Sequence, residues 1–456
     1  MMKLELHAPL HDYQRAAMEH VLAEKGNALF LEMGLGKTLT ALELIYQQDE
    51  KFTLIIAPRR ICEQVWRQEA KKWGYPFEVT FLKGSPSQRR EMLKNPTSKV
   101  YLITPENIIW LESTGLFPFD QVIIDELTKF KSSKSKRWRA LNRMVEEYEP
   151  LMVGLSGTPA PNGYHDLWAQ LFLLDGGKTL GARKGKFLER FFRDTSPDPR
   201  KYNRWELRSG SKQAIDHLLV HGGVIAQTAR EVLGQREPVV LPDLHVELTG
   251  HALGVYEELQ DELMATMPDG TVVLPEHEAT VQMKLRQVAS GFMLDEAKRP
   301  HILDLAKIDT LAEYVEEMDG EPLLVVYTFQ QELRMIRERM SVSYLGGGVS
   351  EKDADRRIAL WNNRELPVLC VQPAAAGHGL NLQHGGHHIL FYSTDWNLET
   401  YQQVIGRLNR QGQQSTVFVR HMSAGPVEEQ IHRGLSRKAE LQKSLMEGLQ
   451  SNAKSV

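Results

Sequence analysis

The 456-residue sequence predicts an α/β protein with two lobes, each built on a parallel sheet. One observation is a set of short apolar runs that alternate with helical stretches, at 53–58, 100–105, 121–126 and 151–159. A second such set lies in the last third of the chain, at 323–327, 342–345, 367–372, 388–392 and 417–422. Functional residues of parallel sheets follow the carboxyl ends of the strands, so the residues after each run are the candidates for a site.

The composition is that of an ordinary globular chain and excludes several classes of protein. The net charge is −4, so any nucleic-acid binding must come from local basic patches. Cys62 and Cys370 lie far apart in apolar surroundings, and we expect buried thiols in a reducing compartment, with no disulfide framework or zinc cluster. From its polar first residues and the lack of a long apolar run we expect no signal peptide and no membrane span. We expect a cytoplasmic protein of a bacterium or phage-infected cell, or a nuclear one in a eukaryote.

A glycine-rich turn follows the apolar run 29–31 and leads into a helix predicted from 38 to about 46. Gly34 and Gly36 allow the backbone to wrap an anion, and Lys37 adds a positive charge toward the outer phosphates of a nucleotide. The Thr38 hydroxyl can bind Mg²⁺. Leu31 stands where the full phosphate-loop pattern has its first glycine. The turn nevertheless predicts a nucleotide-binding site.

Three further polar residues are placed to act on a nucleotide. Asp125 follows a buried strand and can hold Mg²⁺, and Glu126 beside it can accept a proton from an attacking water. The alternative is a helix N-cap followed by a first-turn acid. Gln14, in a helix predicted from 10 to about 24, has an amide that could read an adenine edge, or it is an exposed residue at a helix start.

The remaining charged patterns allow two interpretations each. Arg407 and Arg410 are three residues apart, so one helical face could bring both to a phosphate, or they form a surface pair. Residues 129–139 hold six basic residues and no acid, which suits either phosphate contact or a solvated face. Residues 176–213 hold eleven basic and four acidic residues among aromatics. There we expect the cations to bind nucleic acid and the aromatics to face the core.

In their order along the chain, these motifs resemble the Swi/Snf branch of helicase superfamily two, a group of double-stranded-DNA translocases. The resemblance extends from Leu10 to about Leu445, and its most specific pieces are Met33–Thr38, Leu155–Pro159, Gly377–Leu382, Asp395–Asn397 and Gln403–Gln413. It implies two RecA-like lobes that sandwich ATP with Mg²⁺. The corresponding ranges are lobe 1 at 1–175, helical and basic insertions with the lobe junction at 176–320, lobe 2 with a bracing C-terminal helix at 321–450, and a disordered tail at 451–456.

The resemblance also implies a role for each matched residue. It places the nucleotide against Gln14, Gly34, Leu35, Gly36, Lys37, Thr38 and Leu39, and the metal on Thr38 and Asp125. The residues it implies for hydrolysis are Lys37, Asp125, Glu126, Gln403, Arg407 and Arg410. Those it implies for coupling hydrolysis to motion are Ser156, Gly157 and Thr158. The implied DNA contacts include Arg59, Lys83, Thr104, Gly379 and Asn381.

Two positions depart from the family pattern. Leu127-Thr128 follows the acid pair where the family usually has Ala-His, and Leu31 replaces the usual Asp before Glu-Met-Gly. Neither change removes a catalytic atom. Thr128 stands at the position that usually links the acid loop to the Ser-Gly-Thr segment, so the resemblance supports ATP hydrolysis more strongly than the details of coupling.

The sequence therefore predicts a DNA-dependent ATPase that translocates on double-stranded DNA and remodels DNA or protein–DNA complexes in replication, recombination or repair. Its expected partners are double-stranded or branched DNA, rather than RNA, and replication or repair proteins; no membrane is expected, and the protein is expected to be a monomer. The alternatives are a strand-separating DNA or RNA helicase and an ATP-gated nucleic-acid clamp that does not cycle.

Overall fold

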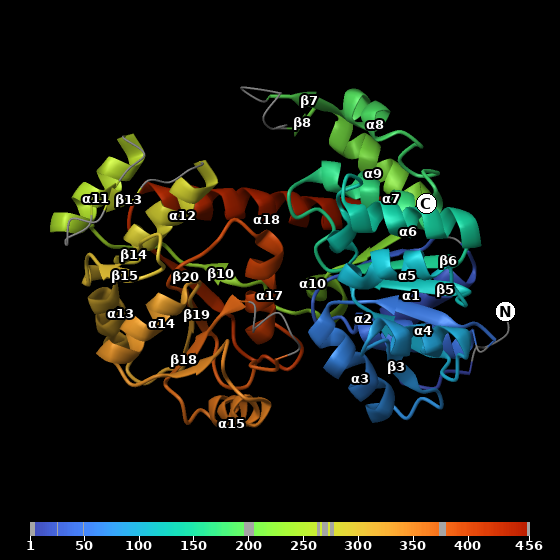
Figure 1. The fold of residues 1–456 in the computed structure, drawn as a ribbon, viewed down its shortest axis with the longest axis horizontal. Helices are drawn as coiled ribbons and strands as arrows, with labels where there is room; N and C mark the ends of the chain where they lie inside the picture. Colours follow the sequence, from blue (N-terminus) through green and yellow to red (C-terminus); the bar gives the residue numbers. More distant parts are fainter. Residues whose placement is uncertain are drawn as a thin grey trace. The chain divides into compact units, whose positions relative to one another are not determined.

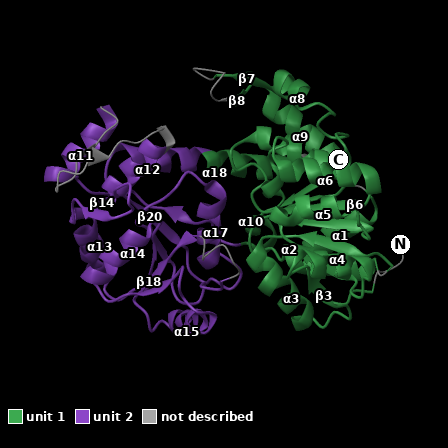
Figure 2. Cartoon of the chain, in the orientation of Figure 1, with its two compact units in different colours: residues 1–234, 438–456 green, residues 235–437 purple. Residues whose placement is uncertain are grey.

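The computed structural model describes residues 5–24, 26–48, 50–195, 205–261, 265–266, 272–273, 278–373 and 380–453. The chain forms two compact units (Figure 2): unit 1 is 1–234 with 438–456, and unit 2 is 235–437. The segment expected to carry the insertions, 176–320, is divided between these units. Both units are built on parallel seven-stranded sheets, which confirms the predicted α/β class with two RecA-like lobes.

The sheet of unit 1 has the strand order β3-β4-β2-β5-β6-β1-β9, with every neighbouring pair parallel (Figure 1). All four apolar runs expected in this lobe form strands. The strands of the sheet are β1 (Ala28–Leu31), β2 (Thr53–Ile56), β3 (Val79–Phe81), β4 (Val100–Ile103), β5 (Gln121–Asp125), β6 (Leu151–Ser156) and β9 (Val224–Gln227).

Alternate residues of these strands feed two separate cores because side chains along a strand point to opposite faces. Phe30 and Ile124 belong to one core, whereas Leu31 and Ile123 belong to the other. A sheet buried on both faces explains why the strands read as continuous apolar runs. The helices of unit 1 are α1 (Asp12–Leu22), α2 (Lys37–Gln47), η1 (Ile61–Val65), α3 (Trp66–Lys72), α4 (Pro86–Lys94), η2 (Pro105–Asn107), α5 (Ile108–Thr114), η3 (Leu127–Phe130), α6 (Lys136–Tyr148), η4 (Tyr164–Asp166), α7 (Leu167–Asp175), α8 (Lys184–Phe191), α9 (Ser211–His221) and α10 (Ala229–Leu233).

The sheet of unit 2 has the order β10-β20-β19-β16-β18-β17, and β11 also pairs with β20. The five apolar runs expected in the second lobe form its strands β16 to β20. The strands are β10 (Val239–Val240), β11 (Leu244–His245), β16 (Leu323–Val326), β17 (Ser343–Leu345), β18 (Val368–Val371), β19 (His388–Phe391) and β20 (Phe418–Ser423). Its helices are α11 (Gly250–Asp261), α12 (Glu278–Ala289), α13 (Ala306–Glu317), α14 (Gln330–Arg339), α15 (Glu351–Asn362) and α17 (Leu398–Leu408).

Three short antiparallel pairs and one long helix complete the fold. The pairs are β7 (Phe192–Asp194) with β8 (Trp205–Leu207), β12 (Ala265–Thr266) with β13 (Val272–Val273), and β14 (Phe292–Leu294) with β15 (Pro300–Ile302). Helix α18 (Pro426–Ala453) begins in unit 2 and ends in unit 1, where Leu445 lies in the core. It includes 451–453 of the predicted tail, and 454–456 lie outside the described residues. In the described part of the chain, no helix has the length and apolar character needed to cross a membrane.

Candidate nucleotide-binding site

The phosphate loop, residues 32–36, connects the buried strand β1 to helix α2. Gly34 and Gly36 have φ angles of +85° and +68°, a region that side chains other than glycine rarely adopt. A Cβ at Gly36 would also collide with the amide nitrogen of Gln14. Because Gly36 immediately precedes α2, the first backbone N–H groups and the positive end of that helix lie at the loop, as a phosphate site requires.

The Lys37 ammonium group lies over this loop. Its Nζ donates hydrogen bonds to the carbonyl oxygens of Leu31, at 2.9 Å, and Glu32, at 3.4 Å. A Cβ built on Gly157 would lie 3.2 Å from the same Nζ, so the Ser-Gly-Thr segment runs beside the loop. The strand register explains this proximity, since Ser156 at the end of β6 pairs with Phe30 of β1.

Asp125 is the last residue of β5, the next strand along the sheet, and it is only 8% exposed. Its Oδ2 accepts a hydrogen bond of 3.1 Å from Trp66 Nε1. Burial raises the pKa of this carboxyl group, while the positive charge of Lys37 and the Trp66 hydrogen bond act to lower it. A bound divalent cation would favour the ionised form of Asp125 and so oppose the effect of burial. The buried carboxylate is therefore better suited to bind a metal ion than to stay ionised by itself.

Glu126 has a left-handed backbone, with φ of 62° and ψ of 64°. This conformation costs a residue with a Cβ about 1–2 kcal/mol. Such strain persists only where the surrounding structure imposes it, and it is concentrated at functional sites. Asp125 still belongs to β5, and Glu126, the residue before η3, makes no side-chain capping hydrogen bond, so the pair is not a capping acid followed by a first-turn acid.

Packing explains why a leucine stands at position 127, where the family usually has an alanine. Leu127 is fully buried in the core, and a Cβ on Gly154 of β6 would lie 2.7 Å from Leu127 Cδ2. A strand glycine therefore makes the space that the leucine fills. Thr128 is also buried, at 2% exposed.

Gln14 is buried and holds the loop from the side of α1. Its Nε2 donates to the carbonyl oxygens of Leu35, at 3.2 Å, and Gly36, at 3.4 Å, while its Oε1 accepts from the His11 N–H at 2.9 Å. The interpretation of Gln14 as an exposed helix-start residue is therefore wrong. Its contact with an adenine edge stays a prediction.

Two protein-family models match this chain. Residues 13–299 match the SNF2-related domain, and residues 306–412 match the helicase conserved C-terminal domain. The chain belongs to the SNF2 family. This finding confirms the Swi/Snf resemblance, and the SNF2 and helicase proteins to which the chain is related are ATPases.

The relatives differ greatly in length. Protein p41 of Acyrthosiphon pisum secondary endosymbiont phage 1 is 32% identical over 96% of this chain and 98% of its own length. Human ZRANB3, a DNA annealing helicase and endonuclease, is 26% identical over 97% of this chain and 41% of its own length. Yeast ISW2, the ATPase of an ISWI chromatin-remodelling complex, is 25% identical over 95% and 40%. This SNF2 chain therefore corresponds to nearly all of the phage protein and to under half of the two eukaryotic ones.

The Ser-Gly-Thr segment of this SNF2 chain is held by contacts that the sequence did not reveal. Ser156 Oγ accepts from the Thr158 N–H at 3.2 Å, and both residues are buried. Just beyond them, the Ala160 N–H donates at 3.0 Å to Oε1 of Gln442, a buried residue of α18. The two partners are 282 positions apart, so no local pattern could have identified Gln442.

The SNF2 motif residues Gln403 and Arg407 lie on α17 in unit 2, where Gln403 Nε2 donates to Glu399 Oε1 at 3.4 Å. Arg410 does not share their helix, which corrects the prediction of one helical face for both arginines. The helix ends at Leu408, after which the chain turns away from helical geometry. The Arg410 guanidinium instead donates to the Leu380 carbonyl at 3.4 Å and to the Asn381 side chain. Gly379 lies outside the described residues.

The expected DNA contacts of unit 1 follow β2, β3 and β4, which are neighbours in the sheet. Arg59 is exposed and pairs with Glu63 at 3.0 Å, and Lys83 is also exposed. Thr104, in contrast, is 4% exposed, and its hydroxyl accepts from Asn107 Nδ2 at 2.9 Å. Any DNA contact at this third position would therefore involve the nearby backbone more than the hydroxyl.

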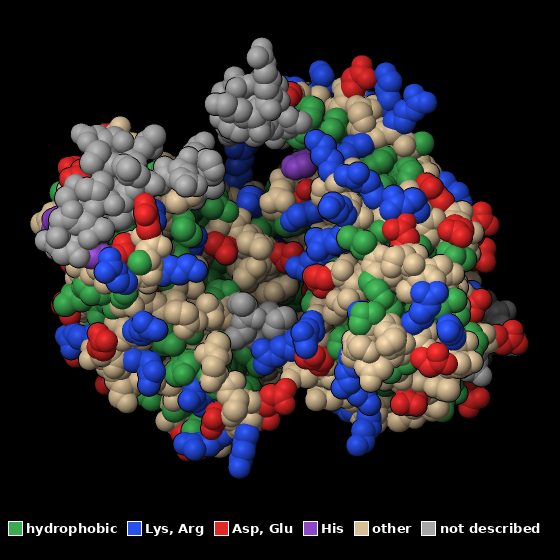
Figure 3. All heavy atoms as spheres, viewed as in Figure 1, with side chains coloured by type: hydrophobic (Ala, Val, Ile, Leu, Met, Phe, Trp, Pro, Cys, Tyr) green, Lys and Arg blue, Asp and Glu red, His purple; other side chains and the backbone are tan. Residues whose placement is uncertain are grey.

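The basic stretches expose part of their cations, whereas their described aromatics are buried or, at Trp205, partly buried against the core. Figure 3 shows Lys and Arg side chains gathered on unit 1 beside the positions that α6 and α9 occupy in Figure 1. Within 129–139, Lys134, Lys136 and Arg139 are exposed. The expectation that the aromatics of 176–213 face the core is confirmed for three of them, Phe187, Phe191 and Phe192. Tyr202 lies outside the described residues.

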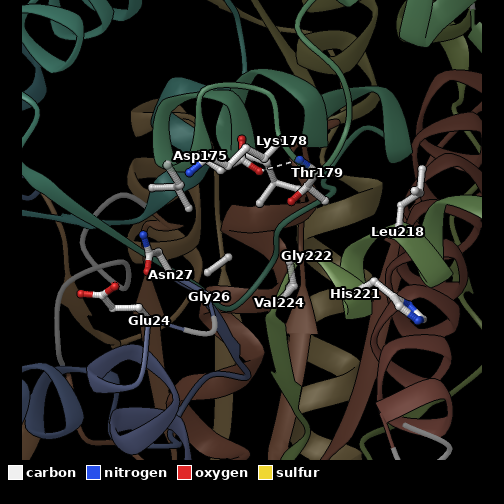
Figure 4. A pocket seen from close by; sticks show the side chains of 13 residues that line it. Glu24, Gly26, Asn27, Asp175, Lys178, Thr179, Leu218, His221, Gly222 and Val224 are labelled. Carbon is white, nitrogen blue, oxygen red and sulfur yellow. Dashed lines mark hydrogen bonds between the residues drawn. The ribbon is translucent and has the colours of Figure 1, made fainter.

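A cavity of about 410 Å³ lies at the amino ends of the strands of the same sheet, opposite the phosphate loop (Figure 4). Asn27 and Ala28, at the amino end of β1, line it together with Val224 at the amino end of β9. Asp175 on its wall accepts the Thr179 N–H at 2.9 Å. The phosphate loop follows the carboxyl end of β1, so this cavity is not the nucleotide site.

Proposed function

We propose that this protein is a DNA-dependent ATPase that translocates on double-stranded DNA to remodel DNA or protein–DNA complexes. The observation that carries the proposal is the order of residues at one sheet edge of unit 1. Asp125 and Glu126, the Ser-Gly-Thr segment and the phosphate loop follow three neighbouring strands, β5, β6 and β1. That order brings a phosphate cradle, a cation and two carboxylates together, which are the groups that phosphoryl transfer to water needs.

The side chains present fit ATP with Mg²⁺. Bound Mg·ATP supplies the phosphoanhydride bond and a cation that neutralises charge on the phosphates. The loop N–H groups between Gly34 and Gly36 hold phosphate oxygens, and Lys37 exchanges its carbonyl partners for them. Thr38 and Asp125 would hold the Mg²⁺ ion. Glu126 orients the attacking water and takes its proton.

Family motifs, rather than contacts, support the assignments in unit 2. We assign Gln403, Arg407 and Arg410 to hydrolysis on this basis. Arginine side chains that stabilise the transferring phosphoryl group raise rates by about 10³ to 10⁵ where they have been measured. Changes that ATP binding and hydrolysis impose on the two lobes would then move the DNA-binding surfaces and step the protein along the backbone.

The proposed setting is replication, recombination or repair in the cytoplasm of a bacterium or phage-infected cell. The full-length likeness to a phage protein supports this setting. The proposed partners are double-stranded or branched DNA and proteins that act on it, with the chain itself working as a monomer. Contacts limited to the DNA backbone would make binding largely independent of sequence and sensitive to salt.

Steady-state ATP hydrolysis tests this proposal. The wild type and Glu126→Gln are assayed without nucleic acid and with duplex DNA, single-stranded DNA, forked DNA or RNA, at two salt concentrations. We expect duplex DNA to stimulate the wild type strongly and high salt to weaken the stimulation. Stimulation by single strands or RNA alone would favour a strand-separating helicase instead. Binding of DNA with no multiple turnover on any nucleic acid would favour an ATP-gated clamp.

A further inference from the structure

Three side chains with metal-binding atoms, none of them a motif residue discussed above, meet inside unit 2. Asp243 precedes β11, His421 belongs to β20, and His432 lies near the start of α18. Strand pairing brings them together, since Leu244 of β11 pairs with Met422 of β20 and α18 follows β20 directly. We call this group the His–Asp–His cluster.

The two histidines direct the same ring atom at the two oxygens of one carboxylate. Nδ1 of His432 lies 2.7 Å from Oδ2 of Asp243, and Nδ1 of His421 lies 3.4 Å from Oδ1. All three ligand atoms lie within 4.8 Å of one another. The side chains of His421 and His432 are 5% and 8% exposed, whereas that of Asp243 is 21% exposed and leaves a route from solvent.

Only one of the two histidines makes a standard hydrogen bond to Asp243. The His432–Asp243 distance is that of a normal hydrogen bond, whereas the buried Nδ1 of His421 lies 3.4 Å from Asp243 Oδ1 and does not meet hydrogen-bond geometry there. An imidazole nitrogen that is buried beside a carboxylate and makes no well-formed hydrogen bond to it is suited to bind a cation.

A second shell holds both rings in place by their other nitrogen. Nε2 of His421 lies 3.1 Å from the Tyr401 hydroxyl, and Nε2 of His432 lies 3.1 Å from the Thr394 hydroxyl. Metal-binding histidines commonly donate their second N–H to such a partner, which fixes the ring and its tautomer. A hydroxyl both donates and accepts, so the same partners accommodate the rings with or without a metal.

We propose that Asp243, His421 and His432 bind one divalent transition-metal ion of the Zn²⁺ class. Two imidazole nitrogens with one carboxylate oxygen suit Zn²⁺ and its neighbours, whereas Mg²⁺ and Ca²⁺ prefer oxygen alone. Tetrahedral ligands about 2.1 Å from Zn²⁺ are roughly 3.4 Å apart, so the Asp243–His432 pair must open by several tenths of an ångström. A water would complete the coordination. His432 would keep its proton as the other tautomer, with Nε2–H donating a hydrogen bond to the Thr394 hydroxyl oxygen.

The ion would fasten three separate segments of unit 2 to one another. Tyr401 belongs to α17, the helix of Gln403 and Arg407, and Thr394 directly precedes the Asp395–Asn397 motif. The bound ion would therefore stabilise α18 and the chain before β11 against these motifs. This inference does not depend on the proposed function.

Co²⁺ binding to the full-length, tag-free protein tests the proposal. The metal-stripped protein is titrated with Co²⁺ in the absence of nucleotide, and its visible absorption is recorded before and after addition of Zn²⁺. We expect one equivalent of Co²⁺ with the intense absorption of a low-coordinate nitrogen-containing site, displaced by Zn²⁺. Zn²⁺ should also raise the melting temperature of the wild type.

Substitutions locate the ion. Asp243→Asn and His421→Gln should each weaken Co²⁺ binding by about tenfold or more and remove the Zn²⁺ effect on melting. His301→Gln is a matched control, because His301 is a largely buried histidine 3.5 Å from a different carboxylate, Asp295; it should bind Co²⁺ as the wild type does. Absence of a one-to-one Co²⁺ complex in the wild type would overturn the proposal even if a variant failed to fold. Unchanged binding in both cluster variants would overturn it too.

Discussion

The carboxyl edge of the unit 1 sheet has two halves that differ in burial. After β5 and β6, the candidate catalytic and coupling residues Asp125, Ser156 and Thr158 are at most 8% exposed. After β2 and β3, the candidate DNA contacts Arg59 and Lys83 are exposed, and the Arg59 side chain reaches 79% exposure, whereas Thr104 after the neighbouring β4 is buried. Charged groups that act on a reacting phosphate are strongest where water is excluded and their geometry is fixed. Lys and Arg side chains that bind the phosphates of the DNA backbone must instead remain accessible to the DNA.

This difference predicts separable defects. Changes in the buried half should abolish hydrolysis, and changes in the exposed half should weaken DNA binding with little loss of the basal ATPase rate. The four predictions below test that separation.

Glu126→Gln should have the largest effect, because an amide cannot take the proton of the attacking water. Hydrolysis should fall by about 10² to 10⁴-fold while ATP binding is retained. Single-turnover hydrolysis and equilibrium nucleotide binding measure the two quantities. Glu106→Gln is the control, since Glu106 is an exposed acid just past β4 in the other half of the same edge. Wild-type turnover in Glu126→Gln would remove Glu126 from the role of base.

Lys37→Ala should lower hydrolysis by about 10² to 10³-fold and should also weaken ATP binding. The variant lacks the ammonium group, which in the wild type lies on the carbonyls of Leu31 and Glu32 and would move from them to the phosphates of ATP. Fluorescent-nucleotide titration distinguishes this variant from Glu126→Gln. Equal ATP affinity in Lys37→Ala and the wild type would contradict the assignment of the loop.

Lys83→Ala should weaken duplex-DNA binding severalfold and reduce the slope of log affinity against log salt by about 1. Its basal ATPase rate should stay that of the wild type. Lys94→Ala serves as control, because Lys94 ends α4 and therefore precedes the amino end of β4. An unchanged salt slope in Lys83→Ala, measured by fluorescence anisotropy, would show that this half of the edge does not contact DNA at Lys83.

Asp125→Asn should change the free energy of unfolding only slightly. Unlike the losses of activity and binding predicted above, this change should be a gain. Burial raises the pKa of Asp125, so its charge destabilises the nucleotide-free fold above that pKa and this cost disappears as pH falls through it. Near neutral pH the variant should be more stable by about 1 kcal/mol, while losing ATPase activity. The stability gain should shrink as pH falls. Denaturant unfolding across pH tests this, and a variant less stable than the wild type at neutral pH would contradict it.

The sequence was informative where function depends on local patterns. Glycines at 34 and 36, Lys37 and the Asp-Glu pair could all be recognised because a phosphate loop and an acid after a strand are each formed within a few residues. Alternation of apolar runs with helices was enough to predict both sheets. The confirmed burial of Cys62 and Cys370 similarly followed from their apolar neighbours.

Features that depend on distant residues could not be predicted in this way. The contact of Gln442 with Ala160 requires that α18 return to unit 1. The His–Asp–His cluster requires the pairing of β11 with β20, two strands about 180 residues apart. The exit of Arg410 from α17 was missed because helical spacing was extended past the point where the chain turns at Leu408.

Displacement of a third strand from a triplex on duplex DNA tests the central claim most directly, because translocation along a duplex removes the third strand without unwinding the two beneath it. We expect the wild type to displace it when ATP is supplied, Glu126→Gln to fail, and Lys83→Ala to need more enzyme for the same rate. DNA-stimulated ATP hydrolysis by the wild type without third-strand displacement would contradict duplex translocation.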